Sequence, residues 1–372
     1  MAEKTDIAWA DSTFNPFIGC TEISPACNNC YAREYAHRFG IAEWGTGKPR
    51  VRTSPANWKK PLQWNARPFY ECPACGQRGD MRCRKQVDVS ALICPTCGVG
   101  VRLSRRRVFC ASLSDVFDNE APAEWRRDLF DLIHATPNLD WMLLTKRIGA
   151  AQRLFDEARM GPPDGGSGYN WLANVWLGAT ICNQEEADRD IPKLLALLAR
   201  VRFLSMEPLL GPVDLTHYLH SSAPQLDWVI VGGESGPNAR LMHPDWARSL
   251  RDLCADADVP FFFKQQGEWA PRRPGPRHDG LDGSTTLPAI NIWPCGYIAA
   301  NGDEFRTLPP STDGIVDQVM CQVMWRVGTK AAGNLLDGRE HKEYPAITET
   351  QVDVGGGGAK WNDEFSKSRG RN

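Results

Sequence analysis

The chain has 372 residues, 42% of them hydrophobic and 24% charged, which suffices for one large domain with insertions or for two domains. Its formal net charge of −2 gives no overall sign of nucleic-acid binding, and no apolar run approaches the roughly 20 residues of a membrane-spanning helix. Thirteen cysteines behind a polar N-terminus favour metal ligation in a reducing compartment over disulfides. We therefore expect a soluble, cytoplasmic protein with no membrane partner.

Residues 19–32 carry three cysteines, Cys20, Cys27 and Cys30, in the spacing C-x6-C-x2-C. A structural zinc site needs four protein ligands, whereas three thiolates can hold a [4Fe-4S] cluster and leave one iron open. The open iron can bind S-adenosylmethionine (SAM) by its amino and carboxylate groups and deliver an electron that makes a carbon radical. Spacing alone leaves two alternatives open, namely buried structural thiols and half of a zinc site completed from elsewhere.

The segment after the cysteines predicts a helix at 31–39 and irregular or short helical structure at 49–64. Between about residues 66 and 104 the pairs Cys72-Pro-Ala-Cys75 and Cys94-Pro-Thr-Cys97, each followed by glycine, are typical of a zinc ribbon. An auxiliary iron–sulfur cluster is the alternative, because four thiolates serve either metal. Cys83 lies between the pairs without a matching partner, and we assign it no role.

From Arg107 onward, short apolar runs alternate with amphipathic segments. The runs occupy 108–111, 141–144, 175–178, 201–204, 228–231 and 259–263, and the segments predict helices at 123–135, 184–198 and 244–256. Apolar runs without polar alternation indicate strands buried on both faces, and therefore a parallel sheet covered by helices. With an N-terminal unit added, the pattern predicts a full or partial parallel βα barrel.

The predicted domains are an N-terminal part of the barrel with the cysteines (1–65), an inserted zinc-ribbon-like module (66–104), the rest of the barrel with a C-terminal extension (105–345) and a flexible tail (346–372). Within the third domain, we expect a glycine-rich loop at residues 164–168, an extended excursion at 270–290 and a helix at 323–336. Four consecutive glycines mark the tail.

Active sites of βα barrels lie at the carboxyl ends of the strands, and polar residues follow nearly every apolar run here. Acidic side chains in these positions can accept hydrogen bonds from an ammonium or a ribose diol, basic ones can bind a carboxylate or phosphate, and glycines let a ligand approach the backbone. The predicted cofactor-binding residues are Ser112, Asp115, Lys146, Thr180, Asn183, Glu207, Gly232, Gly233, Glu234 and Lys264.

Several segments in order resemble the phage and bacterial three-Cys-motif proteins, a poorly characterised family placed with the radical SAM superfamily. They are NPFIGC with the cysteines that follow, FCASLSDVFD, WMLLTKR, VWLGATICNQ, VRFLSMEPLLGPV, WVIVGGESGPNAR, VPFFFKQQG and GTKAAGNLLDGRE. The resemblance covers almost the entire predicted barrel. The cysteine spacing departs from the C-x3-C-x2-C that is usual in the superfamily, and the four-cysteine insert is additional.

The resemblance implies a partial βα barrel with the cluster on Cys20, Cys27 and Cys30 as the catalytic centre and SAM across the strand ends. It also implies two partners, an electron donor of the flavodoxin or ferredoxin type and a three-Cys-motif partner protein. Reductive cleavage of SAM would give methionine and a 5′-deoxyadenosyl radical that abstracts hydrogen from a substrate.

A zinc ribbon beside the basic run 102–107, in a phage-like family, favours DNA and a hypermodified thymine base as the substrate, through a rearrangement or C–C bond formation. A peptide or small molecule is the alternative within the same enzyme class. A non-catalytic, zinc-dependent nucleic-acid-binding or assembly factor is the alternative from another class.

Overall fold

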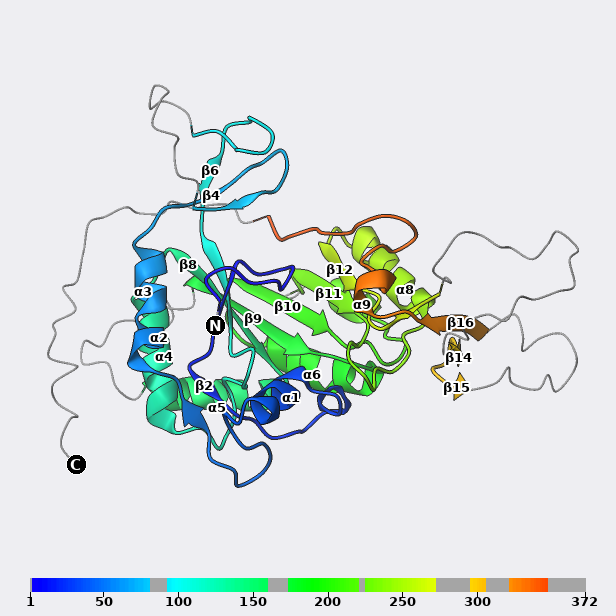
Figure 1. Ribbon diagram of the computed structural model, residues 1–372, viewed down its shortest axis with the longest axis horizontal. Helices are drawn as coiled ribbons and strands as arrows, with labels where there is room; N and C mark the ends of the chain where they lie inside the picture. The colour runs from blue at the N-terminus through cyan, green and yellow to red at the C-terminus, as the bar shows by residue number, and fades with distance from the viewer. Residues whose placement is uncertain are drawn as a thin grey trace, which may run out of the picture.

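A computed structural model of the chain describes residues 2–80, 92–159, 173–220, 225–271, 295–305 and 321–346. Its centre is a seven-stranded, all-parallel sheet in the order β1-β7-β8-β9-β10-β11-β12. The strands are β1 (Ser12–Phe14), β7 (Arg106–Cys110), β8 (Leu139–Thr145), β9 (Val175–Thr180), β10 (Val201–Met206), β11 (Trp228–Gly232) and β12 (Phe261–Gln265). The sheet curls but does not close, so the predicted barrel is a partial one (Figure 1).

Helices connect successive strands of this sheet and cover one of its faces. They are α4 (Ala123–His134), α5 (Ile148–Arg159), α6 (Gln184–Leu195), α7 (Thr216–Leu219) and α8 (Pro244–Asp256). The main hydrophobic core lies between these helices and the sheet. The strands and the three helices predicted from periodicity are therefore confirmed, with boundary shifts of a few residues.

A long excursion joins β1 to β7. It contains β2 (Phe17–Ile18), η1 (Pro25–Cys27), α1 (Tyr31–Arg38), β3 (Val51–Arg52), α2 (Pro55–Trp58) and α3 (Lys60–Asn65), followed by the insert with β4 (Phe69–Glu71), β5 (Arg78–Gly79) and β6 (Arg102–Ser104). The insert strands form their own antiparallel sheet in the order β5-β4-β6. Cys83 lies outside the described residues.

The C-terminal extension differs from the prediction. Residues 323–336 do not form one helix, because β16 (Cys321–Arg326) enters an antiparallel sheet with β13 (Trp269–Ala270), β14 (Cys295–Ala299) and β15 (Glu304–Phe305). The alternating apolar residues Val323 and Trp325 suit a strand as well as a helix, and strand pairing decides between them. Only α9 (Thr329–Ala332) is helical. The loop at 164–168, most of 270–290 and the tail from 347 lie outside the described residues.

The face of the sheet that the helices leave uncovered, here called the inner face, carries large aromatic rings. Trp176, Phe203, Trp228 and Phe262 are fully buried there. Trp9, from the N-terminal segment, packs on them at a ring-centroid distance of 4.6 Å from Phe109 and 6.4 Å from Phe203. This aromatic floor fills the inner face toward the N-terminal ends of the strands, so the remaining polar surface lies at their C-terminal ends.

Candidate functional site

The segment 19–31, here called the cysteine loop, lies at the C-terminal edge of the parallel sheet (Figure 1). Beside β7, the Tyr31 hydroxyl donates to Ser112 O at 2.6 Å. Beside β8, Arg147 donates to Thr21 O at 2.7 Å and lies 4.0 Å from Cys20 Sγ. The loop is therefore tied to the ends of two neighbouring strands.

Two further strands hold the middle of the cysteine loop. The Cys182 thiol, just after β9, contacts the Ser24 hydroxyl and the Ala26 N–H. After β11, Asn29 Nδ2 donates to Glu234 Oε2 at 3.0 Å. The segment that carries the three cysteines thus lies across several strand ends.

Arg50 supports the loop from its other side. Its guanidinium, with a side chain that is 0% exposed, pairs with Asp118 at 2.8 Å and donates to Thr21 Oγ1 at 2.7 Å and to Gly45 O at 3.1 Å. Gly19, at a φ of +112°, packs against Arg50, and Gly45 N donates to Cys20 O at 2.9 Å. Arg50 is not among the site residues predicted from the sequence, because the basic run 48–52 looks like an exposed charged segment and does not show that one of its arginines is buried against Asp118.

The three thiols differ in their surroundings. Cys27 is buried at the end of η1, Cys20 and Cys30 are half-buried, and Cys30 directly precedes α1, whose N-terminus favours a negative charge such as a thiolate. Burial, with Asp115 and Asp118 nearby, raises the pKa of the Cys20 thiol to about 12, while Arg147 acts in the opposite direction. A bound metal would overcome this penalty, because metal ligation deprotonates a thiol.

Within the described residues, none of Cys20, Cys27 and Cys30 belongs to a group of three or more His, Cys, Asp or Glu side chains whose ligand atoms all lie within 4.8 Å of one another. That spacing is the one expected for a single metal ion. A cubane cluster carries each thiolate on a different iron, so its sulfur ligands spread more widely. The donor set of three thiols outside any disulfide, on a loop over the strand ends, fits such a cluster.

Above the aromatic floor, the inner face ends in a polar layer. Residues two apart on a strand share a face, so Thr180 follows Trp176 on β9 and Lys264 follows Phe262 on β12. Thr180 Oγ1 is buried and has no hydrogen-bond partner in the described part of the chain. Lys264 Nζ lies 3.2 Å from Glu207 Oε1, just after β10. Thr180 lies opposite Ser205 on β10, whose hydroxyl donates to Glu207 Oε2 at 3.2 Å. A polar ligand at these strand ends could satisfy the Thr180 hydroxyl.

Other predicted cofactor residues already have protein partners. Asp115 accepts from Thr145 Oγ1 at 2.7 Å, from Phe117 N at 3.0 Å and from Lys146 N at 3.0 Å, which fills most of its acceptor capacity. Asn183 caps α6 by accepting from Glu186 N at 2.9 Å. Asp115 therefore has little capacity left for a ligand, whereas Asn183 uses its amide oxygen for the cap and makes no hydrogen bond through its Nδ2 group within the described residues.

Glu234 is occupied in a similar way. Arg240 donates to it through its backbone N and its guanidinium, both at 2.8 Å, in addition to the bond from Asn29. Burial alone would raise the pKa of Glu234, but the hydrogen bonds from Arg240 and Asn29 outweigh burial and hold this pKa below its usual range. The carboxylate therefore acts as an anchor for the cysteine loop.

The two predicted backbone-approach glycines have other neighbours. A Cβ on Gly233 would collide with the carbonyl of Gln266, so the close approach that glycine permits is made by the chain itself. A Cβ on Gly232 would come within 3.0 Å of Glu207 Oε1. Lys146 and Ser112 complete the edge. The Lys146 ammonium has no ion-pair partner among the described residues, and Ser112 Oγ accepts from Asn15 Nδ2 at 3.0 Å.

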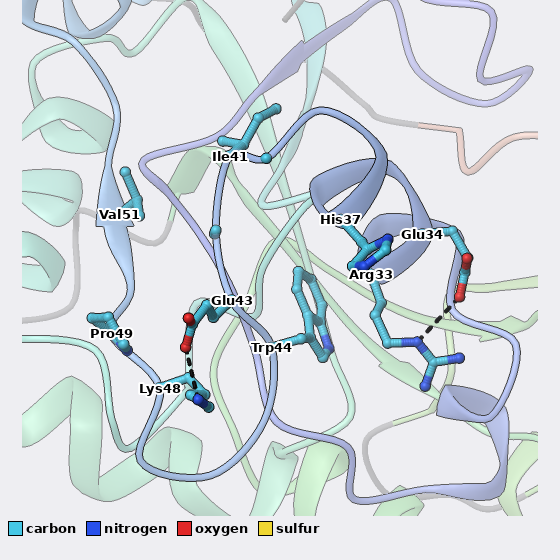
Figure 2. A pocket seen from close by; sticks show the side chains of 11 residues that line it. Arg33, Glu34, His37, Ile41, Glu43, Trp44, Lys48, Pro49 and Val51 are labelled. Atoms are coloured by element: carbon cyan, nitrogen blue, oxygen red, sulfur yellow. Dashed lines mark hydrogen bonds and ion pairs between the residues drawn. The ribbon is translucent and has the colours of Figure 1, made fainter.

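A pocket of about 820 Å³ opens on the outer side of the cysteine loop, between α1 and residues 40–51 (Figure 2). Trp44, Ile41 and Val51 give it an apolar wall. Its charged groups are paired, Lys48 with Glu43 at 2.8 Å and Arg33 with Glu34 at 3.4 Å. Residues 40–51, which form one side of the pocket, also contact Cys20, since Gly45 N donates to Cys20 O. The charged groups of the pocket are paired with one another and do not indicate which kind of ligand would bind there.

The four cysteines of the insert form a second site. Cys72, Cys75, Cys94 and Cys97 bring their sulfur atoms within 4.8 Å of one another, with Cys72–Cys97 at 3.4 Å and Cys75–Cys94 at 3.6 Å. Four thiolates at this spacing could bind one metal ion such as zinc.

The two halves of this four-cysteine centre repeat each other. Cys72 N donates to Gln77 O and Cys94 N to Val99 O, both at 2.8 Å. Gly76 and Gly98 adopt φ of +70° and +74°, a conformation that favours glycine. The glycine after each cysteine pair therefore turns the chain around the sulfur atoms.

Fold and sites together define an α/β protein with a curled, open parallel sheet, a cysteine loop over its C-terminal edge and a four-cysteine site able to bind a metal. The chain belongs to a family described as protein of unknown function (DUF5131), whose match spans residues 4–345. Neither a curated protein nor a solved structure matches the chain significantly. Within the described ranges, every helix is too short or too polar to span a lipid bilayer.

Proposed function

We propose that the protein is a radical SAM enzyme with a [4Fe-4S] cluster on Cys20, Cys27 and Cys30. The observation that supports this most is the attachment of the cysteine loop to residues that follow β7, β8, β9 and β11. A cofactor beside the loop would rest against the polar layer of the inner face. The cluster would supply the electron that cleaves SAM reductively, and the 5′-deoxyadenosyl group would carry the radical to the substrate.

The roles of this chain's own residues follow from which polar groups remain available. The residues that we assign to cofactor and substrate are Thr180, the pair of Lys264 with Glu207, and Lys146, whose ammonium has no ion-pair partner in the part of the chain that the structure describes. Thr180 would donate to or accept from a ligand hydroxyl. Lys264 could leave Glu207 and bind a carboxylate of the ligand, and Glu207 could then bind an ammonium group of the ligand. The aromatic floor beneath them would exclude water from the reaction.

Anaerobic reconstitution with iron and sulfide tests the proposal. We expect about four iron atoms per chain, broad absorbance near about 400 nm, and release of methionine and 5′-deoxyadenosine from SAM under reduction. Cys27→Ala should lose the cluster and this activity. Cys254→Ala, which removes a buried thiol on α8, is the matched control and should retain both. Equal iron content in the wild type and Cys27→Ala would contradict the proposal.

We further propose that the four-cysteine centre holds zinc. As the substrate we propose DNA with a modified thymine base, with a peptide or small molecule as the alternative. The support for DNA is the zinc-ribbon-like insert with the exposed Arg102, because Arg106 and Arg107 of the same basic run are buried in the protein. Comparing the nucleosides of the source DNA by mass, with and without this gene, tests it. An unchanged profile would count against DNA.

One observation favours a second candidate, a non-catalytic zinc-dependent nucleic-acid-binding or assembly factor. Among the described residues, the four-cysteine centre is a complete ligand set for one ion, whereas the three thiols of the cysteine loop are not part of such a set. If the protein contains zinc but no iron after anaerobic reconstitution and does not cleave SAM, this second candidate is favoured over the enzyme.

A further inference from the structure

The insert and the cysteine loop lie at opposite edges of the parallel sheet. β6 leads directly into the start of β7, so the four-cysteine centre is at the N-terminal edge, while the cysteine loop is at the C-terminal edge (Figure 1). The insert therefore does not line the candidate reaction site, and any influence on that site must pass through the protein.

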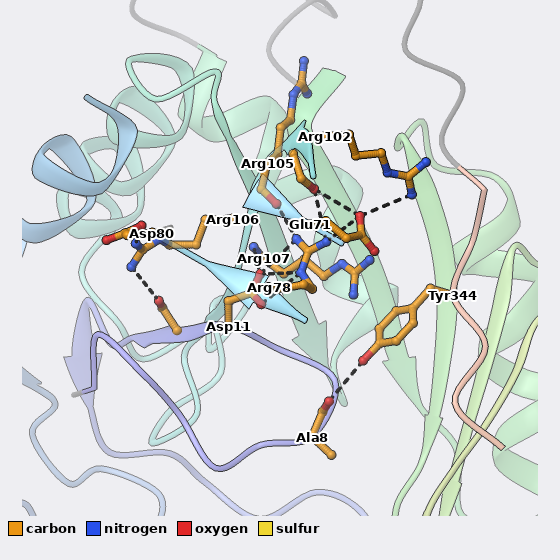
Figure 3. A network of polar contacts seen from close by, with 12 residues as sticks. Ala8, Asp11, Glu71, Arg78, Asp80, Arg102, Arg105, Arg106, Arg107 and Tyr344 are labelled. Atoms are coloured by element: carbon orange, nitrogen blue, oxygen red, sulfur yellow. Dashed lines mark hydrogen bonds and ion pairs between the residues drawn. The ribbon is translucent and has the colours of Figure 1, made fainter. Parts of the chain in front are cut away.

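Arg78 connects the insert to the sheet (Figure 3). It lies on β5, three positions after Cys75, and its side chain is only 11% exposed. Its guanidinium contacts both carboxylate oxygens of Asp11 at 3.0 to 3.2 Å, Glu71 at 3.0 Å and the Arg105 carbonyl at 2.6 Å. Such a bidentate, nearly buried pair is stronger and more directional than a surface ion pair.

Asp11 in turn fixes the N-terminal segment at the edge of the sheet. Its Oδ2 accepts from Arg107 N at 2.8 Å, and its own N–H donates to Arg107 O at 2.9 Å. Arg107 is buried and stacks on Tyr344, whose hydroxyl donates to Ala8 O at 3.0 Å. Residues 8–11 are thus held from both sides.

Trp9 lies within residues 8–11, and its side chain extends toward the C-terminal edge of the parallel sheet. Its ring is 2% exposed within the aromatic floor, and its Nε1 donates to Glu207 Oε2 at 3.3 Å. Glu207 Oε1 is the atom that lies 3.2 Å from Lys264. The four-cysteine centre is therefore linked to the polar layer by the contacts of Arg78 with Asp11 and of Trp9 with Glu207, together with the short chain segments 75–78 and 9–11.

We propose that metal bound at Cys72, Cys75, Cys94 and Cys97 positions the Glu207–Lys264 pair at the opposite edge, with Arg78 and Trp9 as positioning residues. Without metal, the two cysteine pairs are joined mainly by the Gln77 side chain at Cys94 and Thr96 and by the pairing of β4 with β5 and β6, so we expect the turn that places Arg78 to loosen. Asp11 then loses its charged partner, and the segment that carries Trp9 becomes free to shift. The proposal rests on the metal site but not on radical chemistry.

The indole Nε1–H resonance of Trp9 reports on this linkage. It is assigned in a ¹⁵N spectrum as the signal lost in Trp9→Phe, and Glu207→Gln should move it, since that change weakens the acceptor. Chelation of the metal should shift or broaden the signal, and about one equivalent of Zn²⁺ per chain should restore it.

Arg78→Met should reproduce the shift while the zinc content stays at the wild-type level. Arg102→Met is the matched control, because Arg102 also lies on the insert and pairs with Glu71 but is 66% exposed; it should leave the signal in place. If Arg78→Met disturbs the other indole signals as well, Arg78→Lys takes its place.

Hydrogen exchange of residues 5–13 in the metal-loaded and metal-free wild type gives a second measurement, with faster exchange expected in the metal-free form. A Trp9 signal unmoved by metal removal would overturn the proposal. A signal that moves on metal removal but not in the Arg78 variant would overturn the role of Arg78.

Discussion

Asn29 Nδ2 donates to Glu234 Oε2 across 3.0 Å, although the two residues are 205 positions apart in the chain. Asn29 lies between Cys27 and Cys30, and Glu234 follows β11. This bond, with Arg240 donating to the same carboxylate and to Pro25 O at 3.0 Å, fastens the cysteine loop to the sheet. The position of the loop therefore depends on a few specific polar contacts.

Glu234→Gln should lower the free energy of unfolding by about 1.5–3 kcal/mol, because it removes the charged acceptor of hydrogen bonds from Arg240 and Asn29. Urea titration measures the change. Glu34→Gln, at an exposed carboxylate on α1, is the control and should cost less than about 1 kcal/mol. Similar losses in both variants would show that Glu234 is not a special anchor.

Arg50→Met should be more damaging. It leaves the buried Asp118 carboxylate without its partner, which typically costs about 3–5 kcal/mol, and it also removes the donors to Thr21 and Gly45. The temperature of thermal unfolding and the iron content after reconstitution should both be lower than in the wild type. Arg38→Met, at an exposed arginine of α1, should change neither; a stable Arg50→Met protein with full iron content would contradict the assignment.

Gly178→Ala tests the aromatic floor. A Cβ there would overlap the ring of Phe203, so overpacking should cost about 1–3 kcal/mol. Phe203→Leu creates space, and the double variant should lose less stability than the sum of the two single changes. Additive losses in denaturant titrations would mean that the two residues do not share this space.

His243 predicts a pH effect on stability. Burial, with Arg248 nearby, lowers the pKa of His243 from its ordinary 6.5, and Asp245 opposes this only in part. The unfolded chain therefore binds a proton at a higher pH than the folded one, so stability should fall as the pH drops below about 6.5. His243→Asn keeps a residue able to cap α8 and should flatten this fall. Parallel curves of unfolding free energy against pH would exclude His243 as the cause.

Removal of one cysteine from each site should separate the two metals. Cys94→Ser should lose zinc and keep iron, because the two sites are at opposite edges of the sheet, and Cys27→Ala should do the reverse. Metal analysis after reconstitution measures both. Loss of both metals in either variant would mean that the sites fold as one unit.

The sequence predicted the parallel sheet well because each buried strand is a continuous apolar run, as in β9, where every residue from Val175 to Thr180 is buried. The four-cysteine centre was equally accessible, since two C-P-x-C-G segments specify their own turns. The C-terminal antiparallel sheet was missed because its strands pair over long sequence separations, and β16 alone suits either a helix or a strand.

The candidate site was predictable as a location but not in its details. Among the described residues, Thr180 keeps a hydroxyl without a partner, while Asp115 and Glu234 are occupied by Thr145 and Arg240. These partners are distant in the sequence, and only the folded chain brings them near. The parts of Arg50 and Trp9 were missed for the same reason, since each acts through residues distant in sequence.

The rings of Trp176, Phe203, Trp228 and Phe262 fill the described inner face toward the N-terminal ends of the strands. If the polar layer binds a ligand as we propose, the ligand has to reach it from the side of the strand ends, where the cysteine loop lies. A large substrate would then have to present its reacting group at that edge of the sheet.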